Sequence, residues 1–417
     1  MRLSLRNRNP LKNILRAFLK ISIRSLEIFP ALGILRPFLS SSMNLVFRHR
    51  KSIPSGACPY EFCEPRTHQF SNVRIIEVTL FSQPGSARGI GNYLIRLFSD
   101  VSASYLNEVL FISFTRHDAF STPSKSFLGR PIFYFDTRCM NCFTLLKRLS
   151  QGAKKITFTS YFQENITPKY CSSLIEIIPI SNVVIYDMIP KLNLLNFSNI
   201  SRMRAYFAKS RLLAGTNLYP ISLRTKAELE TQGFKVRDVI KYKLTDINSS
   251  TFEKDKTILL FGSMNPRKNI LRTVMAWDLI AHNLPEYTLT LVGHYSNVAK
   301  FLIRKILGSD TNSICFTGEI SDLGLDQLFQ SASMLIAPST DEGLGLPLIK
   351  ALEFGTPVIC ANIDAYRELV LNKKSFFDPY SIHAISQALQ RAITCPDEYI
   401  SNINSLTIGA VDFSELI

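Results

Sequence analysis

Two adjacent basic residues, Arg267 and Lys268, have the type and position needed to bind an anion. They follow Gly262, which ends a short apolar stretch, and Pro266, and a helical pattern begins directly after Asn269. A helix N-terminus favours anions through its free amide groups and its dipole, and two cations at that place suit the charge of a diphosphate. Taken alone, the dipeptide is better interpreted as a solvated basic turn.

A second candidate is the acid Glu342, in the segment 338–347, Pro-Ser-Thr-Asp-Glu-Gly-Leu-Gly-Leu-Pro. This segment lies between an apolar run and a helical pattern whose first turn suits Pro347. Gly343 and Gly345 let the backbone approach a ligand closely. At a helix N-terminus Glu342 can accept hydrogen bonds from sugar hydroxyls. The alternative is that it only caps the helix, because the dipole favours acids there.

The elements that must position these residues follow from alternating patterns on both sides of a polar stretch from Lys243 to Lys256. Such alternation predicts parallel sheets with helices on both faces. Two doubly wound halves place a ligand in the cleft between them, at the carboxyl ends of the strands. The predicted strands are residues 73–81, 109–114, 132–135, 156–158, 182–186 and 212–215, then 257–262, 288–293, 313–317, 333–337 and 357–360. The predicted helices of the second half are residues 270–282, 298–307, 325–330, 346–354 and 381–393.

The net charge of +15 is concentrated near the N-terminus, because residues 1–52 hold eleven Lys or Arg and one acid. This distribution argues against a nucleic-acid-binding body. Residues 10–27 predict an amphipathic helix with a basic stripe, suited to an anionic membrane surface where each nearby Lys or Arg adds about 1 kcal/mol. The alternatives are an organelle transit peptide or a helix that docks on its own protein. No uncharged apolar run reaches the ~18 residues of a membrane span.

The eight cysteines are spread thinly over the 417 residues, which favours a reducing, cytosolic compartment over a disulfide scaffold. Cys139 and Cys142 have the C-x-x-C spacing, and Cys58 and Cys63 lie near His68. Neither pair has a second knuckle at a familiar distance, so unrelated thiols are a better interpretation than zinc ligands.

The order of motifs in the second half resembles that of the retaining GT-B glycosyltransferases often called family 4. The motifs are GxxxPRKN, TGEISDLGLDQLFQSA, APSTDEGLGLPLIKALEFGTPVI, AYRELV and FFDP. The resemblance covers about Val73 to Phe413 and is strong over residues 258–379. It implies that Arg267 and Lys268 neutralise the donor diphosphate as the sugar bond breaks, that Glu342 orients the transferred sugar, and that no metal is used.

The first half carries weaker parts of the same resemblance. Residues 89–93, Gly-Ile-Gly-Asn-Tyr, resemble the family's loop that contacts the donor phosphates, and residues 185–190 resemble its His/Tyr-Asp-Leu-Ile-Pro segment. Residues 213–230 resemble a family strand and helix, with Ser222 at the family's serine. A dehydrogenase loop is a poor alternative because the spacing is GxxxGxG and no acid follows at a strand end. The implied donor-binding residues are Gly89, Gly91, Gly262, Gly293, Gly343, Leu344, Gly345 and Lys350, and the acceptor-side residues are Tyr186 and Asp187.

Three departures from the family pattern bear on activity. Lys350 stands where the family has a second glutamate for the donor ribose, and a lysine cannot accept from two hydroxyls. Glu353, one helical turn on, is a possible substitute. Tyr186 replaces a histidine found in many members. Finally, the family continues beyond residues 413–417 into a helix that crosses back onto the first domain, so we expect that helix to be missing and the domain pairing to be looser.

The predicted fold is therefore α/β and GT-B: two Rossmann-like doubly wound domains facing across a cleft, with a basic helical N-terminal extension. The predicted parts are an extension and linker over 1–70, an acceptor-side domain over 71–245 and a donor-binding domain over 246–417. The predicted function is retaining transfer of a hexose or deoxyhexose, mannose- or rhamnose-like, from a nucleotide-diphosphate sugar. The acceptor is a glycan or lipid-linked molecule of surface polysaccharide synthesis, met at the cytoplasmic face of the membrane. The alternative is a degenerate, non-catalytic relative that binds sugars or partner transferases.

Overall fold

The structure is a computed structural model. It describes residues 73–82, 90–99, 101–106, 108–115, 126–137, 140–162, 166–188, 200–244, 254–307, 313–400 and 407–417. By their contacts the described residues from 73 to 188 and from 204 to 417 belong to one compact unit. The predicted extension over 1–70, with its basic segment 10–27, lies outside the described residues. Among the helices that are described, none is long and apolar enough to cross a membrane.

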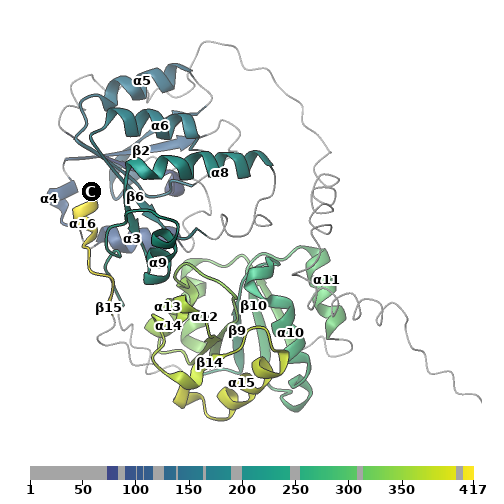
Figure 1. Ribbon diagram of the computed structural model, residues 1–417. Helices are drawn as coiled ribbons and strands as arrows, with labels where there is room; N and C mark the ends of the chain where they lie inside the picture. The colour runs from purple at the N-terminus through teal and green to yellow at the C-terminus, as the bar shows by residue number, and fades with distance from the viewer. Residues whose placement is uncertain are drawn as a thin grey trace, which may run out of the picture. The chain divides into compact units, whose positions relative to one another are not determined.

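A seven-stranded sheet, here the first sheet, is built from the residues before 221 in the order β3-β4-β2-β1-β5-β6-β7. All its pairs are parallel except β3 with β4. Its strands are β1 (Arg74–Glu77), β2 (Val109–Thr115), β3 (Ser126–Phe127), β4 (Arg130–Asp136), β5 (Lys155–Phe158), β6 (Ile180–Ile185) and β7 (Asn217–Pro220). Its helices are α3 (Asn92–Ser99), α4 (Ala103–Leu106), α5 (Met140–Ser150), α6 (Pro168–Ile177), α8 (Ile200–Leu212) and α9 (Leu223–Thr231). Helices α5 and α6 lie side by side (Figure 1).

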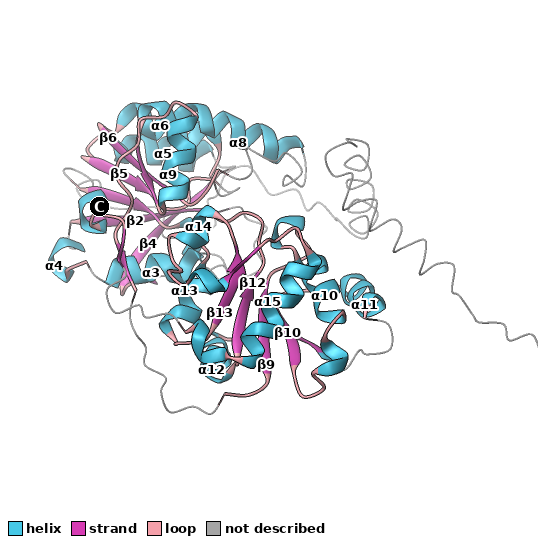
Figure 2. Ribbon diagram, turned by 60° about the horizontal axis from the view of Figure 1, so that its bottom comes forward, coloured by secondary structure: helices cyan, strands magenta, loops and turns pink. Residues whose placement is uncertain are grey.

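A six-stranded, all-parallel sheet, the second sheet, follows in the order β11-β10-β9-β12-β13-β14. Its strands are β9 (Thr257–Phe261), β10 (Thr288–Val292), β11 (Ile314–Gly318), β12 (Met334–Ala337), β13 (Val358–Ala361) and β14 (Phe376–Phe377). Its helices are α10 (Ile270–Asp278), α11 (Asn297–Ile306), α12 (Asp322–Ser331), α13 (Leu346–Glu353), α14 (Asp364–Arg367) and α15 (Ile382–Thr394). Helices α10 and α15 pack against each other (Figures 1 and 2).

The near-continuous apolar strands of the second sheet follow from burial on both faces. In β12 all four residues are buried, and in β9 the three central residues are. The single tryptophan, Trp277 on α10, is fully buried and donates its indole N–H to the carbonyl of Ser313 at 3.1 Å. This bond satisfies the polar end of the largest side chain in the core.

One predicted strand is wrong. Residues 212–215 do not form a strand: Leu212 ends α8, and Leu213–Gly215 form a 3-10 turn. The strand begins later, at Asn217 in β7. Leu213 is buried like Tyr206 and Ser210, which precede it by two turns and by one turn of the helix. Its apolar character therefore belongs to the buried face of α8 rather than to a strand.

We expected the family's crossover helix to be missing, and the C-terminal residues 407–417 nevertheless contact the first sheet. β15 (Thr407–Ile408) pairs antiparallel with β8 (Tyr242–Lys243), and the short helix α16 (Phe413–Leu416) follows it. The carbonyl of Leu416 accepts hydrogen bonds from the Thr157 hydroxyl and from the Asn182 amide, at 2.5 and 2.7 Å. The ring of Phe413 lies 4.9 Å from that of Phe98. These contacts join residues 407–417 to β5, β6 and α3.

Candidate active site

The three residues predicted to do the chemistry lie together. Arg267 and Lys268 end a 3-10 turn (Pro266–Lys268) that follows β9, and Glu342 follows β12. Arg267 Nη1 donates to Glu342 Oε2 at 2.7 Å, and Lys268 Nζ donates to Glu342 Oε1 at 2.6 Å. Each carboxylate oxygen therefore has its own cationic donor. Because β9 and β12 are adjacent and parallel, their carboxyl ends bring residues more than 70 positions apart to one place.

This ion triad is charged at neutral pH. Burial raises the pKa of the Glu342 carboxyl, but the charges of Lys268 and Arg267 and hydrogen bonds from Lys268 and Ser339 outweigh it, and the pKa lies below its usual value. Burial lowers the pKa of the Arg267 guanidinium, but Glu342 outweighs that effect and leaves the pKa raised. Both shifts favour the ionised forms, so two cations stand beside one buried anion.

Asn269 fixes the backbone beneath the triad, and the sequence did not single it out for this role. It is buried in the left-handed conformation at φ 55°. Its side-chain amide donates to the carbonyls of Pro338 and Pro379 at 3.0 and 2.7 Å. The amide of Thr340 donates to the carbonyl of Arg267 at 2.9 Å, which joins the two loops directly. The signal in the sequence was an asparagine before a helix, since Asn adopts this conformation more readily than most residues.

The segment 338–345, which we call the Glu342 loop, holds three of the predicted donor-binding residues, Gly343, Leu344 and Gly345. A side chain at Gly343 would place its Cβ 2.2 Å from the carbonyl oxygen of Tyr186, so only glycine allows this approach. Gly345 has φ +87°, and a Cβ there would meet the Tyr366 ring at 2.6 Å. The side chain of Leu344 is buried in the core. It anchors the loop by packing.

A cavity of about 390 Å³ lies at the carboxyl ends of β9, β10 and β11. Gly293 lines it, and Gly262, at the end of β9, lies against Gly293: a Cβ on Gly293 would be 2.5 Å from the carbonyl oxygen of Gly262. The apolar part of the cavity includes Phe261 and Phe329, whose rings stack at 5.1 Å. Another side of the cavity is lined by Asn92, Tyr93 and Arg96 of helix α3.

Lys350 lines this cavity on α13 and is already paired. Its ammonium forms an ion pair with Asp326 of α12 and lies 5.7 Å from the centre of the Phe354 ring. Glu353, one turn further on α13, is buried and forms an ion pair with Arg96 of α3. The structure thus places Lys350 and Glu353 in one cavity, each with an oppositely charged partner from another helix.

The predicted residues of the first half lie at two places. Gly91 is buried just before α3, and Gly89 lies outside the described residues. Tyr186 follows β6; its carbonyl accepts from the Thr225 hydroxyl at 3.1 Å and lies against Gly343. Burial raises the pKa of the Tyr186 phenol well above its usual value, and the hydroxyl is buried with no hydrogen-bond partner among the described residues. Asp187, next in the chain, also lies close to Gly343.

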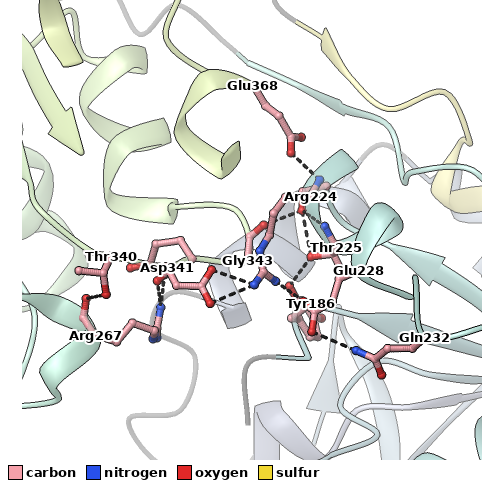
Figure 3. A network of polar contacts seen from close by, with 12 residues as sticks. Tyr186, Arg224, Thr225, Glu228, Gln232, Arg267, Thr340, Asp341, Gly343 and Glu368 are labelled. Carbon is pink, nitrogen blue, oxygen red and sulfur yellow. Dashed lines mark hydrogen bonds and ion pairs between the residues drawn. The ribbon is translucent and has the colours of Figure 1, made fainter. Parts of the chain in front are cut away.

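A polar network that the sequence did not reveal surrounds the Glu342 loop (Figure 3). Nη2 of Arg224, on α9, donates to Asp341 Oδ2 at 3.0 Å and forms an ion pair with Asp341 Oδ1 at 2.8 Å, while Nη1 binds Glu228. The hydroxyl of Ser222 donates to the carbonyl of Gly343 at 2.6 Å. The carbonyl of Asp341 accepts from Arg267 Nη1 at 2.6 Å, which links the network to the ion triad. Of the three side chains Ser222, Arg224 and Glu228, the sequence singled out only Ser222, which stands at the family's serine.

The described residues contain no group of three His, Cys, Asp or Glu arranged to hold a metal ion. Of the eight cysteines, the five in the described part of the chain are free thiols: Cys142, Cys171, Cys315, Cys360 and Cys395.

Comparison with known proteins gives one match to a family model, in the second half of the chain. Residues 243–404 match the family model of the Glycosyl transferases group 1. The O-antigen chain mannosyltransferase B of Escherichia coli is 31% identical over 139 residues, which are 32% of this chain and 36% of that protein. The O-antigen chain mannosyltransferase RfbU of Salmonella typhimurium is 28% identical over 178 residues, 41% of this chain and 48% of that protein. The chain thus spans less than half the length of either relative.

Solved structures resemble the chain over most of its length. The Anabaena protein HepE, solved with UDP and glucose, has a TM-score of 0.58 at 14% identity and covers 78% of this chain and 91% of its own. The sucrose-phosphate synthase of Thermosynechococcus elongatus has a TM-score of 0.56 at 17% identity, with 79% and 91% covered. The chain therefore has the GT-B fold and carries, over residues 243–404, a segment that matches the Glycosyl transferases group 1.

Proposed function

We propose that the protein is a retaining glycosyltransferase. It moves a hexose or deoxyhexose from a nucleotide-diphosphate sugar to a glycan or lipid-linked acceptor of polysaccharide synthesis. The observation that carries the proposal is the ion triad of Arg267, Lys268 and Glu342. The match to Glycosyl transferases group 1 and the two O-antigen mannosyltransferases supports the reaction class.

The triad has the charges that the reaction requires. In the structure Glu342 is the anion that holds Arg267 and Lys268 in place. A donor diphosphate carries more negative charge than one carboxylate, so it displaces Glu342 from the two cations. They then stabilise the charge that develops on the leaving diphosphate as the sugar bond breaks. The released carboxylate of Glu342 is free to accept hydrogen bonds from sugar hydroxyls and to orient the ring.

The nucleoside part of the donor fits the neighbouring cavity, where Phe261 and Gly293 supply an apolar wall and an open backbone. A mannose- or rhamnose-like sugar is the first choice, since both relatives named above are mannosyltransferases. Tyr186 and Asp187 face the Glu342 loop from the first sheet and are proposed for the acceptor side. Contact of residues 10–27 with the cytoplasmic face of a membrane stays a prediction.

The test is release of nucleotide from a panel of UDP-, GDP- and dTDP-sugars by the purified full chain, with and without candidate glycan acceptors. We expect release with one donor class and loss of release in the Glu342→Gln variant. If no donor releases nucleotide and the wild type matches Glu342→Gln throughout, the enzyme proposal fails.

The rival is a non-catalytic relative, and Lys350 is the observation that favours it. At the place where the family resemblance implies an acceptor for ribose hydroxyls, the chain has an ammonium bound to Asp326. Calorimetric titration with UDP, GDP and dTDP separates the two functions, because a chain that has lost donor recognition binds none of them well. Binding of one nucleotide in preference to the others supports the enzyme and names the base of its donor.

A further inference from the structure

Arg224 is the central residue of the polar network around the Glu342 loop (Figure 3). It lies on the first turn of α9 and its side chain is 12% exposed. One end of its guanidinium holds Glu228 on the same helix, and the other holds both carboxylate oxygens of Asp341. Asp341 directly precedes Glu342 in the chain. A single nitrogen, Nη2, makes both contacts with Asp341, and Nη1 binds Glu228, so the guanidinium is held between the two carboxylates.

Three further contacts join α9 to the second-sheet part of the chain. The Glu368 carboxylate accepts from the amides of Leu223 and Arg224 at 2.8 and 2.6 Å, which satisfies the free amides at the start of α9. The Ser222 hydroxyl donates to the carbonyl of Gly343 at 2.6 Å. The start of α9 is therefore fixed, and Arg224 extends from a rigid base toward Asp341.

The position of Asp341 in turn determines the position of Arg267. Arg267 Nη1 is shared between the carbonyl of Asp341 at 2.6 Å and the carboxylate of Glu342 at 2.7 Å. If Asp341 moves, its carbonyl moves with it, and Arg267 must shift relative to Glu342. Burial raises the pKa of the Asp341 carboxyl, while the charges of Arg224 and Arg267 oppose that rise.

We infer that Arg224 is a positioning residue: through Asp341 it holds the Glu342 loop, and with it Arg267, in the geometry that the transfer requires. The inference rests on the proposed function. It adds a residue of the first-sheet side that touches neither donor nor cavity, and it makes the geometry of the donor site depend on α9.

The test compares Arg224→Ala with Lys226→Ala. Lys226 lies on the same helix and forms an exposed ion pair with Asp238, so its removal is the matched control. Hydrogen–deuterium exchange of the Glu342 loop amides is the first measurement, because it needs no substrate. We expect exchange about tenfold faster in Arg224→Ala, as for loss of about 1.4 kcal/mol of local stability, and no change in Lys226→Ala. Unchanged exchange in Arg224→Ala overturns the inference.

Kinetics of donor turnover is the second measurement. We expect Arg224→Ala to lower kcat by about tenfold or more with KM within about twofold, because the donor still meets its cations but not in the reactive geometry. Arg224→Lys should recover part of kcat, since a lysine gives a single point contact, and it serves as the test variant if Arg224→Ala does not fold. A rise in KM with unchanged kcat contradicts a positioning role.

Double variants show whether Arg224 acts through Asp341 or through another contact. In an Asp341→Asn background Arg224→Ala should add less than about twofold, whereas in a Glu228→Gln background it should keep its full effect. Equal effects in both backgrounds mean that Arg224 acts through another contact, and the inference fails. If the wild type turns over no donor at all, the proposed function fails instead, while the exchange experiment still decides whether Arg224 holds the loop.

Discussion

At Glu342 one carboxylate satisfies the two cations that the proposed reaction needs for the diphosphate. Removing its charge therefore has opposite effects on binding and on chemistry. We expect Glu342→Gln to bind free nucleoside diphosphate more tightly than the wild type, because Arg267 and Lys268 lose their internal anion. Transfer should fall by about a hundredfold or more, because the sugar loses its acceptor. Calorimetry and donor turnover on one preparation check both, and weaker binding together with full turnover contradicts the displacement mechanism.

The difference in stability between Glu342→Gln and the wild type should depend on pH. The folded pKa of Glu342 lies below the usual value of 4.5, so its charge stabilises the fold fully above that pH and progressively less as the pH falls through the folded pKa. We expect Glu342→Gln to be less stable than the wild type by about 2 kcal/mol at pH 7. The difference should shrink below pH 4.5. Urea unfolding at pH 7 and pH 3.5 measures it, and a difference that is independent of pH contradicts the ion triad.

A further prediction at the residue scale concerns Lys350, whose ion pair with Asp326 must be taken into account in the test. Lys350→Glu alone sets two acids against each other, because its partner is Asp326. We expect that variant to lose about 1 kcal/mol of stability, a typical value for a partly exposed pair. The swapped pair, Asp326→Lys with Lys350→Glu, should restore stability and keep or improve nucleotide affinity. Thermal unfolding and calorimetry of the wild type, Lys350→Glu and the swapped pair measure stability and nucleotide affinity. If the swapped pair does not recover stability, the two residues act independently.

At the scale of elements, the approach of the Glu342 loop to Tyr186 depends on one glycine. We expect Gly343→Ala to destabilise the fold by about 2 kcal/mol, because its Cβ would overlap the Tyr186 carbonyl and force the loop away. Gly215→Ala is the matched control, since a Cβ there meets Ile175 Cγ2 at an ordinary 3.7 Å. Urea unfolding compares the two variants, and equal losses would contradict the close approach.

The elements differ in how much the sequence reveals. Five of the second-sheet strands were predicted to within a residue or two at each end, because runs such as β12 are buried along their whole length and end at glycine, proline or a cap. The two-residue edge strand β14 was not predicted, because two residues are too few to show a pattern. Residues 212–215 failed because an apolar run of four residues fits a strand and the buried face of a helix equally well. Arg267, Lys268 and Glu342 were each singled out from motif and charge, but their ion pairs with one another were not predicted. Arg224 and Asn269 were not singled out for their roles, because the partners that define those roles, Asp341 and Pro338, lie more than 65 residues away and follow no local pattern.

At the scale of the whole molecule, the C-terminal residues 407–417 tie the far end of the chain to the first sheet. Phe413 is the apolar part of this contact, being buried against Phe98, while the carbonyl of Leu416 takes two donors from β5 and β6. We expect Phe413→Ala to lower the free energy of unfolding by about 3 kcal/mol, as for other buried aromatic residues. Leu371→Ala, at a side chain 72% exposed, is the control and should cost less than about 0.5 kcal/mol.

Phe413→Ala also tests whether the contacts of the C-terminal residues with the first sheet affect nucleotide binding at the cavity. Because α16 contacts β5, β6 and α3, its loss should speed hydrogen exchange in those elements first. Helix α3 also carries Arg96, which holds Glu353 at the cavity, so nucleotide affinity should fall together with the protection of α3. Hydrogen exchange of Phe413→Ala measures the protection of α3, and calorimetry measures its nucleotide affinity. If α3 loses protection while nucleotide affinity is unchanged, the C-terminal segment stabilises the first sheet without helping to shape the cavity.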